Sequence, residues 1–319
     1  MKRQRGIAVI MAILIVALAA SVASFMMWKQ QFWLRQVANL DGQSQASVTG
    51  LAALELGKIA LFEYSKSNPT VTHLEQSWAA RITLPTKDGV VNGVIKDQQG
   101  LYNLNNLLRD AAKKDDKDKL ETKLFKRLLA LQKLPEELAE AVVDWIDSDS
   151  EVSGAGGAED LDYLGLKIPY RAANRPMVDV SELIRIKGFD AEAVKKIRPY
   201  VTALPEATPV NVNMAPPEVL AALFDINLSE AKALAELRSG ETAFFKDDTD
   251  FKERAKKVNV DLSKQTPPAQ PGSDYSVTSK YFVINIQTEY TGLRATYAAL
   301  VAINPNVWPH MLWQKQLAN

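Results

Sequence analysis

The chain has 319 residues, of which 47% are apolar and 24% are charged, and this length favours two lobes. Lys and Arg together number 38, as do Asp and Glu, so the formal net charge is zero and the basic excess of a typical nucleic-acid-binding protein is absent. There is no cysteine, which excludes disulfides, thiolate metal sites and a cysteine nucleophile; two histidines, His73 and His310, argue against His-based zinc sites and a Ser-His-Asp triad. We therefore expect a protein that is not an enzyme.

The N-terminus begins with a short basic stretch followed by a long uncharged one. Lys2, Arg3 and Arg5 precede the 21 residues of Ile7–Met27, none of which carries a charge. As a helix this segment would be about 31 Å long, which matches the hydrocarbon core of a bilayer. Because basic residues favour the cytoplasmic side, we expect a single-pass membrane helix with a cytoplasmic N-terminus and the bulk of the chain on the opposite side of the membrane.

A secretory signal peptide that is removed whole is the alternative interpretation. Such peptides usually have apolar runs of about 7–15 residues and a small-residue cleavage site. Here the apolar run is longer and leads into residues 28–64, which contain no proline. Apolar side chains between Val48 and Phe62 recur at helical spacing. The pattern predicts one long helix that is hydrophobic in its first half and amphipathic in its second.

The basic leader that ends in Gly6, followed directly by the apolar helix, resembles the leader of type IV pilin-like proteins. The resemblance implies that a prepilin peptidase cuts between Gly6 and Ile7 and methylates Ile7. In that family the first mature residue is usually Phe and the fifth is usually Glu, whose carboxylate neutralises the terminal amine of a neighbouring subunit. This chain has Ile7 and Met11 at those positions. Because an uncompensated charge in an apolar filament is costly, a subunit without the Glu suits the first position of a filament.

Two short stretches in the next part of the chain have the composition of strands. Residues 81–84 and 90–96 flank Asp88-Gly89, which is a hairpin signal. Residues 113–119 mix charges of both signs and predict a solvated loop or helix start. Between 120 and 146 the leucines and other apolar residues recur on one face, which predicts two helices.

The C-terminal part again has the alternation of strands. A linker rich in Pro, Ser and Gln spans Ser263–Ser273, and apolar residues then alternate with polar ones over Phe282–Ile286. Thr291-Gly292 supplies a turn before a second apolar run. We expect these strands to complete a sheet that packs on the N-terminal helix.

Two segments resemble minor pseudopilin K of the type II secretion system, the general secretion pathway protein K family. One runs from Asp144 through a Gly-rich loop to the motif Tyr170–Pro176, and the other is Asn211–Leu220. The resemblance implies an α+β fold in which a pilin-like long N-terminal helix packs on an antiparallel sheet, with a large inserted α-helical domain. The expected divisions are 1–6 (leader), 7–27 (transmembrane or filament helix), 28–108 (helix continuation and first strands), 109–260 (inserted helical domain) and 261–319 (C-terminal strands).

The same resemblance implies a function and partners. A pseudopilin K is expected at the tip of the type II secretion pseudopilus, where it nucleates assembly with other minor pseudopilins, of the I and J type, for protein export. Further implied partners are the prepilin peptidase, the inner-membrane secretion platform, and secreted substrate proteins or the outer-membrane channel. No nucleic acid is expected as a partner.

Six carboxylates flank the Gly-rich loop at 154–157. The first cluster resembles the start of an EF-hand loop but departs from it at Val152 and Ala158, where that motif has Gly and Glu. The glycines let the backbone curl back, and carboxylates folded together repel one another unless a hard cation such as Ca²⁺ lies between them. Members of the resembled family bind calcium, whereas a solvated acidic loop is the alternative. The candidate ligands are Asp147, Asp149, Glu151, Glu159, Asp160 and Asp162.

Residues 180–197 and 217–234 resemble degenerate helix-hairpin-helix units, which bind DNA phosphates through backbone amides of a Gly-rich turn. The first keeps Gly188, but the second has Asp225, which would repel phosphate. We interpret both as packing units. They nevertheless define the alternative function, a membrane-anchored DNA-uptake protein. A membrane-tethered hydrolase, the third class, has no convincing nucleophile and base.

Overall fold

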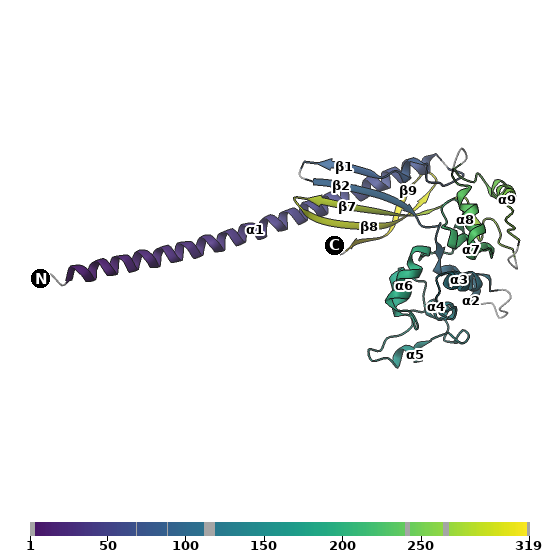
Figure 1. The fold of residues 1–319 in the computed structure, drawn as a ribbon, viewed down its shortest axis with the longest axis horizontal. Helices are drawn as coiled ribbons and strands as arrows, with labels where there is room; N and C mark the ends of the chain where they lie inside the picture. Colours follow the sequence, from purple (N-terminus) through teal and green to yellow (C-terminus); the bar gives the residue numbers. More distant parts are fainter. Residues whose placement is uncertain are drawn as a thin grey trace.

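A computed structural model describes residues 4–67, 69–87, 89–111, 119–239, 243–263 and 268–317 (Figure 1). Four parts of the sequence predictions lie outside these residues: Lys2 and Arg3 of the leader, Asp88 of the hairpin turn, most of the charged segment 113–119, and residues 264–267 of the expected linker.

The first 63 described residues form one helix, α1 (Gln4–Lys66), as the sequence predicts. The helix ends three residues before Pro69, the first proline of the chain, because proline disfavours helix at and before its position. From Ile7 to Asp41 every side chain is exposed, and this part is long and apolar enough to cross a membrane. Burial begins at Gly42, so the two halves of α1 have different surroundings.

The second half of α1 packs on a five-stranded antiparallel sheet. In spatial order the strands are β1 (Ile82–Thr86), β2 (Gly89–Asp97), β7 (Tyr281–Tyr290), β8 (Leu293–Asn304) and β9 (Val307–Leu317). Leu54 and Leu61 of α1 are buried against Ile284 and Ile286 of β7. The helix approaches the sheet closely at Gly50, where an added Cβ would lie 2.6 Å from the Tyr297 ring.

Both hairpins expected from the sequence are present. β1 pairs antiparallel with β2, and β7 pairs with β8 across Thr291 and Gly292, whose φ angles of 48° and 84° suit a tight turn. β9 was not predicted from the sequence. It contains Pro309 and forms one edge of the sheet, the position at which a strand tolerates proline. The predicted fold class, a long helix on an antiparallel sheet with an inserted helical domain, is confirmed.

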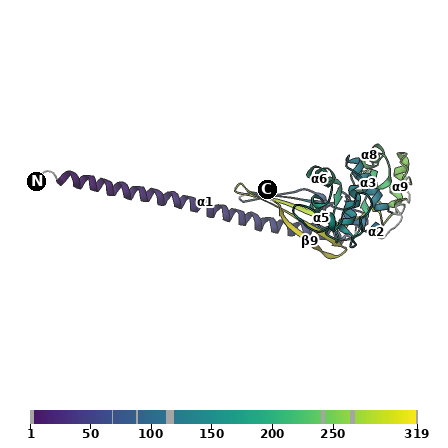
Figure 2. The same ribbon diagram turned by 90° about the horizontal axis from the view of Figure 1, so that it is seen from below.

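The helical lobe is inserted between β2 and β7. These strands pair from Gly89 opposite Tyr290 to Asp97 opposite Phe282, and the Gln98 backbone N–H donates to the Tyr281 carbonyl at 3.0 Å. The chain therefore leaves the sheet and returns to it at one place. Figures 1 and 2 show the lobe at the end of the molecule farthest from the N-terminus.

The lobe has its own hydrophobic core, which runs from Tyr102 to Tyr275 and so extends beyond both ends of the range 109–260.

The helix after Pro135 begins at Leu138. The first hairpin-like unit starts with a 3-10 turn rather than an α-helix, whereas the second consists of two α-helices joined at Asp225, whose φ is 53°. The helices are α2 (Leu108–Ala111), α3 (Leu120–Leu131), α4 (Leu138–Ile146), α5 (Asp160–Leu164), α6 (Ala191–Ile197), α7 (Pro217–Phe224), α8 (Leu228–Glu236) and α9 (Asp248–Lys257).

The remaining elements of the lobe are short. The 3-10 turns are η2 (Leu104–Leu107), η4 (Val180–Arg185) and η5 (Arg198–Tyr200), and η1 (Ser77–Ala79) precedes the sheet. The lobe also contains two pairs of two-residue parallel strands. In one pair β3 (Tyr102–Asn103) lies beside β4 (Val201–Thr202), and in the other β5 (Val210–Asn211) lies beside β6 (Tyr275–Ser276).

Candidate metal site

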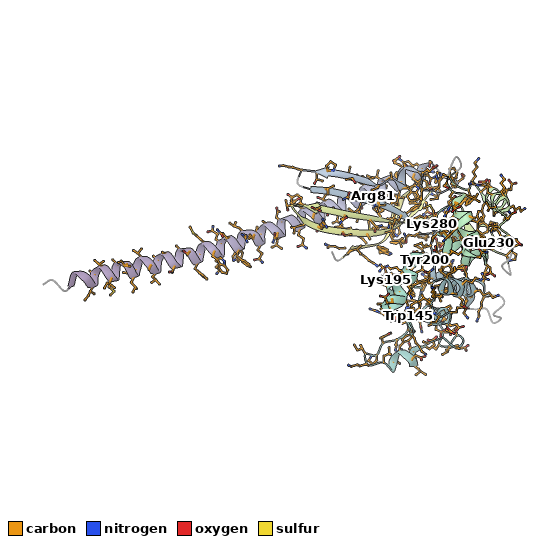
Figure 3. The ribbon with its side chains drawn as sticks, viewed as in Figure 1. Arg81, Trp145, Lys195, Tyr200, Glu230 and Lys280 are labelled. Atoms are coloured by element: carbon orange, nitrogen blue, oxygen red, sulfur yellow. The ribbon has the colours of Figure 1, made fainter. Side chains whose placement is uncertain are left out.

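The candidate site begins where α4 ends. The helix is buried along Val142, Trp145 and Ile146, and Asp147 follows as its C-terminal cap with extended backbone. Asp147 is consequently only 5% exposed, whereas Asp149 two residues later is exposed. Figure 3 labels Trp145, which marks this helix within the lobe.

The Gly-rich loop is held against α4 by two carboxylates that the sequence analysis did not identify. Asp144 accepts hydrogen bonds from the backbone N–H groups of Ser153 at 3.0 Å and Ala158 at 2.8 Å, and Glu140 accepts one from Gly156 at 2.9 Å. A Cβ at Gly156 would lie 2.2 Å from the Glu137 carbonyl oxygen, so only glycine allows this approach. The loop therefore returns the chain to the end of α4.

This return brings three of the six candidate ligands together. One carboxylate oxygen each of Asp147, Asp149 and Glu159 lies within 4.8 Å of the others. Asp147 Oδ1 and both carboxylate oxygens of Glu159 are buried and have no hydrogen-bond partner among the described residues. Buried polar atoms normally have a partner, so these three oxygens fit a cation between them.

The electrostatics of the group agree with its geometry. Burial first, and then the charges of Asp149 and Asp144, raises the pKa of Asp147 to about 7. Burial, followed by repulsion from Asp144, Asp147 and Asp149, raises the pKa of Glu159 to about 7. Without a compensating positive charge, the folded protein therefore favours the protonated forms of both side chains below about pH 7.

The other three candidate ligands lie apart from this group. Glu151 is exposed, and its backbone N–H donates to Asp149 Oδ1 at 2.8 Å. Asp160 accepts from the Ala172 N–H at 3.0 Å. Asp162 accepts from Lys187 Nζ at 2.8 Å, which lowers the pKa of Asp162, and it also caps the start of α5 at the Glu159 N–H.

An aromatic cluster supports the site from inside the lobe. Trp145 of α4 meets Tyr163 of α5 edge to face, with ring centroids 5.3 Å apart, and Tyr163 stacks on Tyr170 at 5.4 Å. These rings fix α5, whose N-terminal cap is Glu159, against α4. The acidic group is thus anchored on both sides by packed aromatic side chains.

Comparison with known proteins places the lobe in one family. The family described as type II secretion system (T2SS), protein K, matches residues 100–206 and 210–271, which include the acidic group. The type II secretion system protein K of Pseudomonas aeruginosa is 36% identical over 256 residues, covering 77% of this chain and 75% of that protein. The protein of the same description from Aeromonas hydrophila is 32% identical over 312 residues, covering 92% of this chain and 91% of that protein.

A solved structure resembles the whole arrangement. It is the crystal structure of the GspK-GspI-GspJ complex from the type 2 secretion system of enterotoxigenic Escherichia coli. One of its chains is 27% identical to this chain, with a TM-score of 0.76, and the match covers 89% of this chain and 100% of that one.

The raised pKa values of Asp147 and Glu159 predict a pH dependence of stability in the absence of metal. Their ordinary values are 3.8 and 4.5, so the contribution of these two groups to stability should be fully present below about pH 4 and be lost as the pH rises to about 7. A fragment starting at about Gln43, in chelator, should have a higher Tm at pH 5 than at pH 8.

The variant Asp147→Asn with Glu159→Gln should lose much of this difference, because neutral amides carry no charge to bury. Asp97 and Glu121, whose pKa values burial raises to about 6 and about 7, contribute equally to both proteins and cancel in the comparison. An identical Tm shift in fragment and variant would contradict this interpretation.

Proposed function

The chain belongs to the type II secretion system protein K family, a family of minor pseudopilins, and from that premise we propose that it lies at the tip of the pseudopilus. There it nucleates assembly with other minor pseudopilins for protein export. Its role is structural rather than catalytic. The observation that carries the proposal is the arrangement of α1, whose first half is uncovered and apolar and whose second half carries the folded lobes at the far end.

The residue at the fifth position of the mature chain supports a place at the filament tip. Met11 is exposed and stands where pilin-like subunits usually have a carboxylate for the terminal amine of a neighbour. A subunit without that carboxylate cannot neutralise the amine of another subunit, which would otherwise be buried unpaired. It therefore suits the tip of the filament, where there is no neighbouring subunit whose terminal amine must be neutralised.

The shape of the molecule gives a second argument. The helical lobe occupies the end opposite the N-terminus, in the direction in which a further subunit of a filament would lie (Figures 1 and 2). A lobe of this size beyond the sheet leaves no regular position for a subunit ahead of it. The lobe thus fits the end of a filament better than its shaft.

Before assembly we propose that the chain is anchored in the inner membrane by Ile7–Met27, with the N-terminus in the cytoplasm and the lobes in the periplasm. A prepilin peptidase cuts after Gly6 and methylates Ile7. Minor pseudopilins of the I and J type are the proposed tip partners, since the related Escherichia coli chain occurs in a complex with GspI and GspJ. The secretion platform and secreted substrates or the outer-membrane channel complete the proposed partners.

We also propose that Asp147, Asp149 and Glu159 hold Ca²⁺. The fit rests on three buried oxygens without hydrogen-bond partners among the described residues, one of Asp147 and two of Glu159, and on the approach of Asp149 to both side chains. A hard cation prefers such oxygen ligands. Bound calcium would supply the positive charge that the group lacks and so fix the Gly-rich loop. Glu151, Asp160 and Asp162 are supported less well as ligands, because they do not belong to the group of carboxylate oxygens that lie within 4.8 Å of one another.

The proposed processing predicts the mass of the mature protein. When the chain is produced with its prepilin peptidase and extracted from membranes, mass spectrometry should find a chain that begins at methylated Ile7. The same chain produced without the peptidase should begin at Met1. A mature N-terminus near residue 25 would instead indicate an ordinary signal peptide and would contradict the filament role.

The proposed calcium site predicts a gain in thermal stability. A ligand that binds only the folded state stabilises it by about 2.7 kcal/mol at a hundredfold excess over Kd. The fragment from about Gln43 should therefore melt several degrees higher in millimolar Ca²⁺ than in chelator, as judged by calorimetry. Mg²⁺ should stabilise less, since it requires tighter octahedral geometry.

A pair of variants separates this site from general charge effects. Asp147→Asn with Asp149→Asn should abolish the calcium-dependent shift. Glu192→Gln with Glu236→Gln, which removes two exposed charges elsewhere, should keep it. Equal melting of the wild-type fragment with and without calcium would show that the loop is only a solvated acidic turn.

A further inference from the structure

The first hairpin-like unit, residues 180–197, and the adjoining η5 turn carry an exposed groove that the tip role does not use. The groove has a volume of about 460 Å³ and lies between the η4 turn and α6. Its floor consists of Ile184, which is 49% exposed, together with Val194 and Pro199. An apolar floor that remains open to solvent is a common feature of surfaces that bind another protein.

The rim of this groove is basic. Lys195 and Arg198 line it, and no carboxylate does. Arg185 and Lys196 lie exposed nearby, and none of these four cations forms an ion pair with any residue that the structure describes. Lys195, Lys196 and the C-cap Arg198 also complement the dipole of α6, whereas Arg185 lies on η4. In a chain of zero net charge, this local excess favours an acidic partner.

The turn of this unit is poorly suited to holding a phosphate. A Cβ at Gly188 would lie 2.6 Å from Leu138 Cδ2, so the exposed turn lies close to the start of α4. The backbone N–H groups of Phe189 and Ala193 donate within the unit, to the Ile186 carbonyl and to Asp190 Oδ1. These two amides are therefore used within the fold and are not free to hold a phosphate.

We propose that this groove binds an amphipathic helix of a partner protein that presents aliphatic residues to Ile184 and Val194 and carboxylates to Lys195 and Arg198. A helix fits because the groove lies between a helical turn and a helix, where no strand edge is offered for pairing. α6 lies on the side of the lobe nearer to the N-terminal end of α1 in both views, and Figure 3 marks Lys195 on it. The inference does not depend on the tip position.

The test uses synthetic peptides and the full-length chain in phosphatidylcholine nanodiscs, with fluorescence anisotropy as the readout. A helical peptide with a leucine face and a glutamate face should bind saturably, and more weakly as salt increases. The same peptide with lysine in place of glutamate, and a DNA duplex, should not bind. Tighter binding of the duplex, or equal binding of both peptides, would overturn the proposal.

Matched variants assign the binding to the groove. Lys195→Glu with Arg198→Glu should weaken binding of the acidic peptide by about tenfold or more, since two attractions become repulsions. Lys256→Glu with Lys257→Glu makes the same charge change at the end of α9 and should have no effect. Equal loss in both variants would show a general charge effect and contradict the proposed groove.

The apolar floor is tested in the same assay. Ile184→Ser should weaken the part of the binding that persists at high salt, and Leu161→Ser, at a side chain that is 87% exposed on α5, should not. Because both side chains are exposed, neither change should alter the fold, which circular dichroism checks. Unchanged binding by the Ile184 variant would rule out the groove as the site.

Discussion

The architecture depends on an apolar helix surface that the protein covers only in part. In the second half of α1, side chains such as Leu54 and Leu61 are buried by the sheet, whereas Ile7, Phe25 and Trp28 in the first half are more than 60% exposed. Leaving apolar area in water costs about 25 cal/mol per Å². The first half therefore requires a membrane or the helices of other subunits, and this requirement sets where the rest of the molecule lies.

The pairing of β2 with β7 explains how one sheet can carry so large an insertion. Because Gln98 and Tyr281 are joined by a backbone hydrogen bond, the helical lobe begins and ends at one point and leaves the register of the sheet intact. Its hydrophobic core is separate from the core between α1 and the sheet. The lobe is thus packed independently of the part in which α1 lies on the sheet.

Sequence patterns predicted the helices and strands that are defined by residues close together in the chain. The uncharged run predicted α1, and alternation with a Thr291-Gly292 turn predicted β7 and β8. β9 was missed because Pro309 argues against a strand unless its edge position is known. The helical spacing of residues 180–185 likewise could not distinguish an α-helix from the 3-10 turn observed.

The candidate site shows a different limit. The sequence pattern identified six carboxylates, but which of them converge depends on hydrogen bonds that the loop backbone donates to Asp144 and Glu140. One available signal was Asp144 itself, an acid on the apolar face of α4, which must find donors when buried. Partners from distant segments, such as Lys187 on Asp162, have no signal in the local sequence.

The central claim is that the uncovered helix and the distal lobe place this chain at the end of a filament. Electron microscopy of assembled pseudopili, with a gold label attached to the helical lobe, tests this most directly. We expect a single label at one end of each labelled filament. Labels distributed along the shaft would show that the chain is an ordinary shaft subunit and would contradict the account.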